Sequence, residues 1–186
     1  NLGNVDAYVY EGAAVSYAGE VFSLNLSFHN GGDSNLEDDD LNTELSFSYT
    51  GIENLVIGGG FLFDNKGNLS STETDIVNVH AAYQTGKFLV AAEYSEADVD
   101  GTATNDKLDA YMFLADYSVS DKLAIAVRIS ANEVDDGSAD GVDHDKLTIA
   151  PRYAITDSLG AVIEFSDIDV GTEDANLVAV ELTYTF

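Results

Sequence analysis

The sequence predicts an all-β protein, an antiparallel up-and-down transmembrane β-barrel of about 11–12 strands. Three features lead to this prediction: segments in which apolar and polar residues alternate, connections of two alternating lengths, and aromatic residues at both ends of the apolar face. A membrane-spanning strand takes about 9–11 residues with an apolar outside, a polar inside and aromatic residues at the interfaces.

The segment 176–186 carries this alternation most clearly, because successive side chains of a strand point to opposite faces. One face holds Val178, Val180, Leu182, Tyr184 and Phe186. The other face holds Leu177, Ala179, Glu181, Thr183 and Thr185. The segment therefore has an apolar side that ends on an aromatic residue and a more polar side.

The same alternation recurs along the chain, and no segment has the period of a helix. Between residues 21 and 28, for example, Phe22 and Leu24 oppose Ser23 and Asn25. About eleven strands are expected in this chain. They cover residues 5–17, 21–28, 41–49, 55–63, 76–84, 88–95, 108–119, 123–132, 146–155, 160–166 and 176–186.

The connections between these strands are expected to alternate strictly between two kinds. Short turns fall at 18–20, 51–54, 85–87, 120–122 and 156–159. Long polar loops fall at 30–40, 64–75, 96–107, 133–145 and 167–175. Short turns at one rim and long loops at the other are typical of outer-membrane barrels. The Greek-key links of a β-sandwich would not segregate in this way.

Aromatic residues gather at the two rims of the apolar face. Beside the short turns lie Tyr17, Phe22, Tyr49, Tyr83, Phe88, Tyr117, Tyr153, Tyr184 and Phe186. Near the long loops lie Phe28, Phe63, Tyr94 and Phe165. The outward residues between these belts are mostly aliphatic, which predicts a lipid-facing band with an aromatic girdle at each interface. The core of a sandwich would instead collect its rings in the middle.

Composition sets further bounds on function. The 186 residues have room for one substantial domain, so residues 1–186 are interpreted as a single β-barrel domain. The chain has no Cys, which excludes disulfides and thiol chemistry. Its net charge is −27, with 34 acidic residues against 7 Lys plus Arg. This charge argues against nucleic acid as a partner and favours cations.

The chain resembles the C-terminal half of the OmpL-like β-barrel porins of Gram-negative bacteria. Four stretches carry the resemblance: SYAGEVFSLNLSFHNGG (16–32), DKLAIAVRIS (121–130), KLTIAPRYAITDSLGAVIEFSDID (146–169) and LVAVELTYTF (177–186). It is strongest over 108–186. The resemblance implies the outer membrane, contact with membrane lipid, and passive diffusion of small hydrophilic solutes; a homo-oligomer is a further possibility.

Members of that family are longer than this chain and carry further strands before the matched region. Single-chain bacterial barrels have even strand numbers with both termini on the periplasmic side, whereas eleven strands leave the start on the outer side. Two interpretations stay open. Either residues 2–10 contain a short twelfth strand, or the chain is the C-terminal portion of a larger barrel, which we favour.

The polar faces of the strands are expected to line the lumen. Their charged residues lie about four to seven positions from the short-turn rim and so fall within one layer, at about 3.3 Å per residue. The candidate pore-lining residues are His80, Glu93, Asp116, Arg128, Arg152, Glu164 and Glu181. A basic pair facing acidic groups would set a transverse field that selects solutes by charge. Alternatively, the same residues form salt bridges that rigidify the wall.

The expected long loops hold most of the acidity. The first carries Asp33 and the run 37–40; the fourth carries Glu133, Asp135, Asp136, Asp140, Asp143 and Asp145. An acidic vestibule would concentrate cations over a Debye length of about 8 Å. The pairs Asp98 and Asp100, and Asp167 and Asp169, have a spacing that could suit Ca²⁺. No complete calcium-loop motif occurs, and no cofactor is expected.

Catalysis has little support in the sequence. His29 and His144 fall at or in loops, His80 faces the expected lumen, and no spacing pairs any of them with a nucleophile. The run 58–60 of glycines indicates a close-packed or bulged strand. The preferred function is a cation-preferring porin, not an enzyme. The alternatives are a barrel with a closed lumen that binds a partner or Ca²⁺, and a soluble acidic β-sandwich.

Overall fold

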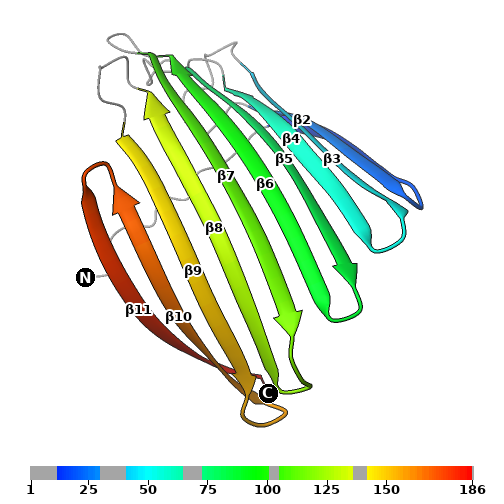
Figure 1. Cartoon of the computed structure of the whole chain (residues 1–186). Coiled ribbons are helices and arrows are strands. Elements are labelled where there is room, and N and C mark those ends of the chain that lie inside the picture. Colours follow the sequence, from blue (N-terminus) through cyan, green and yellow to red (C-terminus); the bar gives the residue numbers. More distant parts are fainter. Residues whose placement is uncertain (1–11, 30–40, 65–72, 101–104, 136–141, 186) are drawn as a thin grey trace, which may run out of the picture.

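The computed structural model describes residues 12–29, 41–64, 73–100, 105–135 and 142–185, which form one antiparallel sheet (Figure 1). Its strands are β1 (Gly12–Ala18), β2 (Phe22–His29), β3 (Asn42–Ile52), β4 (Leu55–Asp64), β5 (Glu73–Thr85), β6 (Phe88–Asp100), β7 (Asn105–Ser118), β8 (Leu123–Asp135), β9 (Val142–Ala154), β10 (Leu159–Val170) and β11 (Glu173–Tyr184). They follow one another in space in sequence order, which confirms the predicted all-β, up-and-down topology. No helix in these ranges is long and apolar enough to cross a bilayer.

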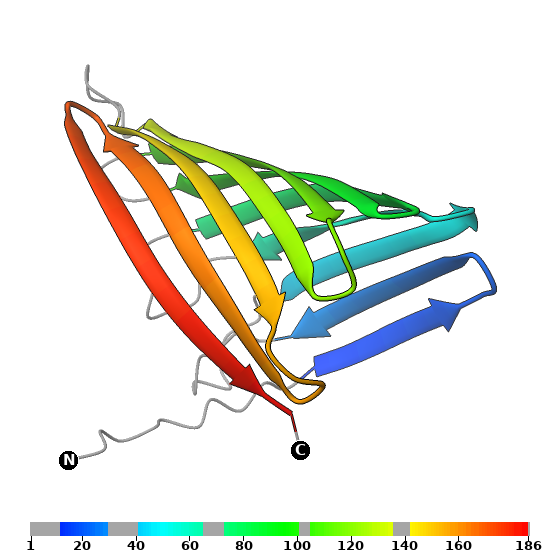
Figure 2. The same ribbon diagram turned by 60° about the horizontal axis from the view of Figure 1, so that its bottom comes forward.

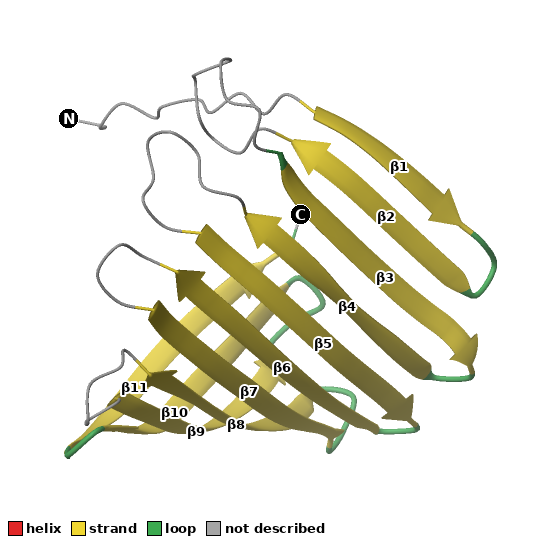
Figure 3. Cartoon of the chain, turned by 90° about the horizontal axis from the view of Figure 1, so that it is seen from above, coloured by secondary structure: helices red, strands yellow, loops and turns green. Residues whose placement is uncertain are grey.

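The sheet is strongly curved and forms a trough with a concave and a convex face (Figure 2; Figure 3). β1 and β11 lie at its two edges, and no ladder joins them within the described ranges. The twelfth strand considered for residues 2–10 lies outside the described residues. The sheet is therefore an open wall of the kind that closes into a barrel.

The pairing of the strands assigns every residue to one of the two faces of the sheet, because residues directly opposite each other on neighbouring strands share a face. His80 lies opposite Gly58 and Glu93. The next residue, Val79, lies opposite Gly59 and Tyr94. The least exposed polar side chains all fall on the face of His80: Asn42, Asp116, Thr148 and Ser166. Side chains converge on the inside of a curve, so the polar face is the concave one.

Large apolar residues cover the convex face and stay exposed. Val15 is 72% exposed, and Val180 and Leu182 are each 67% exposed. Among the described residues, Ala150, which is 8% exposed, has the one buried apolar side chain. Monomeric soluble proteins rarely expose apolar patches of this extent. The residues that the structure describes therefore form no apolar core of their own, and the convex face requires an apolar solvent around it.

Several predicted loops are too long, because the strands continue past them. β6 runs to Asp100 and β7 begins at Asn105; β8 runs to Asp135 and β9 begins at Val142. Acidic residues occupy every second position in these ends, and their polarity alone suggested loops. Where carboxylates alternate with apolar residues, the ladder can continue beyond the lipid, since water solvates the carboxylates.

The predicted fifth long loop, 167–175, is wrong, and so is the strict alternation of loop lengths. β10 continues to Val170, and Val170 pairs with Glu173 at the start of β11. Gly171 turns the chain between them with a φ of 57°. Glycine adopts positive φ at no steric cost, which permits a tight hairpin turn at this place.

Candidate functional site

All seven candidate pore-lining residues lie on the concave face, one on each strand from β5 to β11. In strand order they are His80, Glu93, Asp116, Arg128, Arg152, Glu164 and Glu181. Period-two alternation placed each of them, and the ladder register now fixes their neighbours. The structure brings two subsets into contact, one on β7–β9 and one on β5–β6.

Arg152 reaches across β8 to Asp116. Its Nη2 donates to both carboxylate oxygens of Asp116, at 2.9 and 2.7 Å. Between them β8 presents Ala124 and Ala126, whose small side chains leave the path open. The side chain of Asp116 is 12% exposed and that of Arg152 is 51% exposed. This pair is a salt bridge along the wall, as in the alternative in which the charges rigidify the barrel.

Asn78 connects His80 with Glu93. Its Nδ2 donates to Glu93 Oε1 at 2.8 Å and to Ser95 Oγ at 2.7 Å, and its Oδ1 lies 3.3 Å from His80 Nδ1. Asn78 and Ser95 were not among the predicted site residues. The sequence did contain a signal for them, because both belong to the polar face of their strands. Asn78 lies two residues before His80 in β5 and therefore points to the same side of the sheet.

The glycines of β4 allow close packing on both faces. A Cβ at Gly58 would lie 2.6 Å from Nε2 of His80, so the imidazole rests over this glycine on the concave side. A Cβ at Gly59 would lie 2.5 Å from the backbone oxygen of Asn78 and 3.1 Å from the ring of Phe47. The close-packed strand predicted for this run is confirmed.

The remaining candidates do not join these contacts. Arg128 lies between Leu114 and Thr148, and its Nε is buried without a hydrogen-bond partner in the described part of the chain. Glu181 accepts a hydrogen bond from Thr183 Oγ1 at 3.3 Å. The two arginines therefore differ, since Arg152 pairs with Asp116 and the Nε of Arg128 has no acceptor among the described residues.

The convex face becomes acidic at the loop end of β5–β10. Convex positions there carry Asp75, Glu96, Asp98, Asp109, Glu133, Asp135, Asp143, Asp145, Asp167 and Asp169. At the loop end of β4–β8 a row of concave positions is apolar, namely Leu62, Ile76, Ala97, Leu108 and Val134. Other concave positions at this end are charged or polar, such as Asp64, Asp106, His144 and Lys146. Lys107 lies among the convex acids with Nζ 3.2 Å from Glu96 Oε2. This hydrogen bond raises the pKa of Lys107 above its usual value.

The predicted acidic vestibule is therefore wrong for part of its residues. Glu133, Asp135, Asp143 and Asp145 belong to β8 and β9 and stand on the convex face, not in a loop at the mouth. The remaining acidic residues of the first and fourth loops lie outside the described residues: Asp33, the run 37–40, Asp136 and Asp140. Because the strands continue through this region and successive side chains alternate between the faces, the acidic residues of β8 and β9 all point to the convex side.

The predicted interface aromatics within the described residues all lie on the convex face. They are Tyr17, Phe22, Phe28, Tyr49, Phe63, Tyr83, Phe88, Tyr94, Tyr117, Tyr153, Phe165 and Tyr184, and Phe186 lies outside these residues. The ring centroids of Phe88 and Tyr117 are 4.5 Å apart. Sequence reasoning missed four further convex rings, those of Phe47, Phe61, Tyr111 and Phe113.

Tyr94 and Phe165 were predicted beside the long loops, but neither lies at a strand end. β6 continues from Tyr94 to Asp100, and β10 continues from Phe165 to Val170. The Tyr94 hydroxyl hydrogen-bonds with the carboxylates of Glu96, at 2.8 Å, and Asp109, at 2.5 Å. On β6, Tyr94 therefore marks the boundary where the apolar convex surface gives way to the acidic one.

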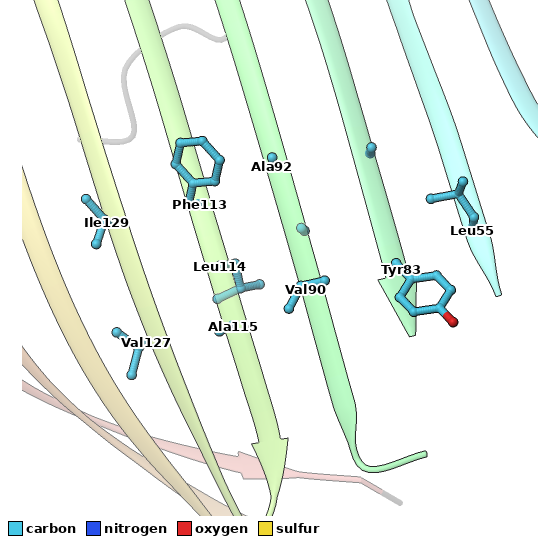
Figure 4. A pocket seen from close by; sticks show the side chains of 11 residues that line it. Leu55, Tyr83, Val90, Ala92, Phe113, Leu114, Ala115, Val127 and Ile129 are labelled. Carbon is cyan, nitrogen blue, oxygen red and sulfur yellow. The ribbon is translucent and has the colours of Figure 1, made fainter. Parts of the chain in front are cut away.

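A shallow apolar hollow of about 450 Å³ opens on the convex face over β4–β8 (Figure 4). Small residues form its floor, and two rings flank it; the labelled lining includes Ala92, Ala115, Val90, Tyr83 and Phe113. Because no charged side chain lines it, the hollow offers nothing to orient a hydrophilic solute. It belongs to the apolar outer surface.

The predicted calcium positions lie on strands and not in loops. Asp98 and Asp100 are in β6, and Asp167 and Asp169 are in β10. In the described ranges no three His, Asp or Glu side chains are grouped to hold a metal ion. His144, expected in a loop, is in β9 on the concave face opposite Asn132, because β9 begins earlier than predicted. His29 ends β2, with Nε2 3.2 Å from Glu44 Oε1.

A family model described as Gram-negative porin matches residues 1–186. No curated protein matches the chain in sequence.

Solved outer-membrane proteins share the fold. A loop L8 deletion mutant of OmpT, an outer membrane protein of Vibrio cholerae, superposes with a TM-score of 0.72 and 17% identity, over 92% of this chain and 61% of that one. OmpT in its trimer form gives 0.70 and 15%, over 92% and 63%. A porin refined at 1.8 Å gives 0.69 and 18%, over 97% and 64%. The chain thus spans less than two thirds of each of these proteins.

Proposed function

The chain belongs to the Gram-negative porin family, and we propose that it forms the wall of a diffusion pore for small hydrophilic solutes that prefers cations. It is an outer-membrane β-barrel protein, as its family and its structural relatives indicate. The proposal goes further, because it assigns the concave face of this chain to the pore and gives that face a charge preference.

One observation carries the proposal: on the turn side of the acidic loop end, the convex face is apolar while the concave face carries polar and charged residues with an excess of carboxylates. The described concave carboxylates include Glu44, Glu93, Asp116, Glu164 and Glu181, whereas the concave cations are Arg128, Lys146 and Arg152. Arg152 is already paired with Asp116. The remaining excess of carboxylates favours cations in a water-filled lumen, where rings of charged side chains set ion selectivity.

The surroundings of His80 also explain why we expect a channel and not an enzyme. A catalytic site requires a nucleophile or a general base held against a partner group. In the described part of the chain, the side-chain hydrogen bond of His80 is with Asn78, which orients the ring but cannot take a proton as a base. We therefore expect no hydrolytic activity from this protein.

Planar-bilayer recording tests the proposal. We expect ohmic current steps, and in a KCl gradient a reversal potential displaced toward the K⁺ equilibrium potential. Glu164→Gln and Glu181→Gln should each reduce this displacement, because both remove concave charge. Asp167→Asn, on the convex face of β10, is the matched control and should leave the displacement unchanged. A barrel with a closed lumen would give no steps, and the proposal would then be wrong.

We also expect a homo-oligomer, as one structurally similar outer-membrane protein has a trimer form. The convex hollow of Figure 4 is the apolar surface that a second copy could cover. Light scattering of the detergent-solubilised protein measures the mass of the protein part. A mass equal to one chain would contradict this expectation without affecting the pore proposal.

A further inference from the structure

A second region of the concave face differs in chemistry from the candidate pore-lining charges. At the loop end of β4–β8, neighbouring strands place five apolar residues directly opposite one another: Leu62, Ile76, Ala97, Leu108 and Val134. We call this continuous row the apolar strip. Diffusion of hydrated ions does not require an apolar row on the wall that faces water, so the strip indicates a ligand with an apolar part.

A hollow of about 230 Å³ adjoins one end of the strip at Gly60. Gly60 has no side chain to fill it. The apolar residues Leu62 and Ile76, with Leu45 and Phe61, line part of the hollow, and four polar residues also line it: Glu44, Asn25, Ser46 and Asn78. An apolar hollow with a few converging polar groups is the usual form of a small-molecule site.

Carboxylates give the region its charge. Glu44 lies directly opposite Leu62; Ser27 Oγ lies 3.3 Å from its Oε2, and His29 Nε2 lies 3.2 Å from its Oε1. Asp106 shares the face of Leu108, and its Oδ1 is buried without a hydrogen-bond partner within the described ranges. A buried carboxylate oxygen in this state is stabilised by a cation. The hollow and the strip are thus apolar surfaces bordered by negative charge.

We propose that this region is a binding subsite for small organic cations on their way into the pore. The ammonium group binds Glu44, and the aliphatic body lies along Leu62 and Ile76. A hydrated inorganic cation gains nothing from the strip, and an anion of the same body is repelled by Glu44. The inference rests on the proposed porin function and names the class of solute that the outer end of the pore favours.

Hexylammonium is the probe, with ammonium as the control for charge and hexanoate as the control for the apolar body. Isothermal titration of the full chain in lipid nanodiscs should detect saturable binding of hexylammonium alone. In bilayers, hexylammonium added from the loop side should block the K⁺ current in a concentration-dependent way, while ammonium should not block it.

Variants separate the two halves of the subsite. Leu62→Ser and Ile76→Ser should each weaken hexylammonium binding about tenfold, since pocket discrimination of this order follows from lost apolar contact. Glu44→Gln should weaken it by removing the charge. Val56→Ser is the matched control, because Val56 lies on the same face of β4 about 20 Å from Leu62, at about 3.3 Å per residue. Its binding should equal that of the unchanged protein.

The inference is overturned if hexylammonium does not bind, which is also the result expected when a loop of this chain covers the strip. It is equally overturned if Leu62→Ser and Ile76→Ser bind as tightly as Val56→Ser. Binding with the expected variant pattern but no K⁺ current would retain the subsite and overturn the porin proposal. A cation-selective current without hexylammonium binding would do the reverse.

Discussion

Along β7, the convex face is apolar or aromatic in the turn-side half and carries charged residues at the loop-side end. Near the turn Asp116 is concave and Phe113 is convex, whereas at the loop end Leu108 is concave and Asp109 is convex. Side chains alternate between the two faces along the whole of β7, so the change in residue type reflects a change in the surroundings of the convex face and not a change in the strand. Lipid surrounds the turn-side half of the convex face, and water or headgroups surround its loop-side end.

The type of residue on each face therefore indicates whether lipid or water contacts that face at a given level along the strands. Tyr94 and Tyr111 lie opposite each other on β6 and β7, one step below Glu96 and Asp109. Above that level an apolar convex side chain has no lipid to contact, and a concave one can serve a ligand. The change from apolar to acidic residues on the convex face therefore marks the upper lipid boundary, and the apolar strip lies on the concave face just above it.

The largest expected effect comes from a charge in the lipid-facing band. Val127→Arg should destabilise the barrel by about 2–4 kcal/mol, the usual cost of Arg near the bilayer midplane. Val127 lies between Ala115 and Ile149 on the convex face. The matched variant Ala131→Arg, beside Tyr111 and Asp145, should cost about 0–1 kcal/mol near the interface. Urea unfolding in lipid vesicles measures both; equal costs would refute the assigned boundary.

The glycine pair on β4 gives the next effect and compares the two faces directly. Gly59→Ala should cost about 1–3 kcal/mol, because its Cβ meets the backbone oxygen of Asn78. Gly58→Ala should cost less, since its nearest obstacle is the tip of the His80 ring, which can rotate away. Unfolding midpoints of the two variants decide the point. A larger loss for Gly58→Ala would mean that His80 is held rigidly.

The salt bridge on the concave face is expected to contribute less. Arg152→Gln leaves the carboxylate of Asp116 without its partner and should cost about 1–2 kcal/mol, allowing for the half-exposed Arg152 side chain. Asp116→Asn together with Arg152→Gln should recover part of this loss. The single variant should also increase the preference for K⁺ over Cl⁻, as measured by reversal potential. An unchanged preference would place this pair outside the conducting path.

The smallest effect is expected at the boundary itself. Tyr94→Phe removes the hydroxyl that meets Glu96 and Asp109 but keeps the ring. The cost should be about 0.5–1.5 kcal/mol, the net worth of one hydrogen bond. Heat-induced unfolding followed by gel mobility can detect it. A cost near that of Val127→Arg would show that Tyr94 lies deep in the lipid.

Alternation and turn residues were sufficient to predict the strands, their order and their faces. The ends of β6, β8 and β10 were not predictable in this way, because a polar residue looks the same in a loop and in a strand that continues into water. For the candidate site, period two placed Asp116 and Arg152 on one face. It could not pair them, since the contact skips β8 and depends on the small residues Ala124 and Ala126 between them.

The central claim is that lipid contacts the convex face and water the concave face. Since the chain has no Cys, single cysteines introduced along β8 report each position separately. In lipid vesicles, cysteines at Ala126 and Ser130 should react with a water-soluble thiol reagent, and those at Val127 and Ile129 should not. Beyond Ala131, a cysteine at convex Glu133 should become reactive. Protection of Glu133, or equal reactivity at Val127 and Ala126, would contradict the account.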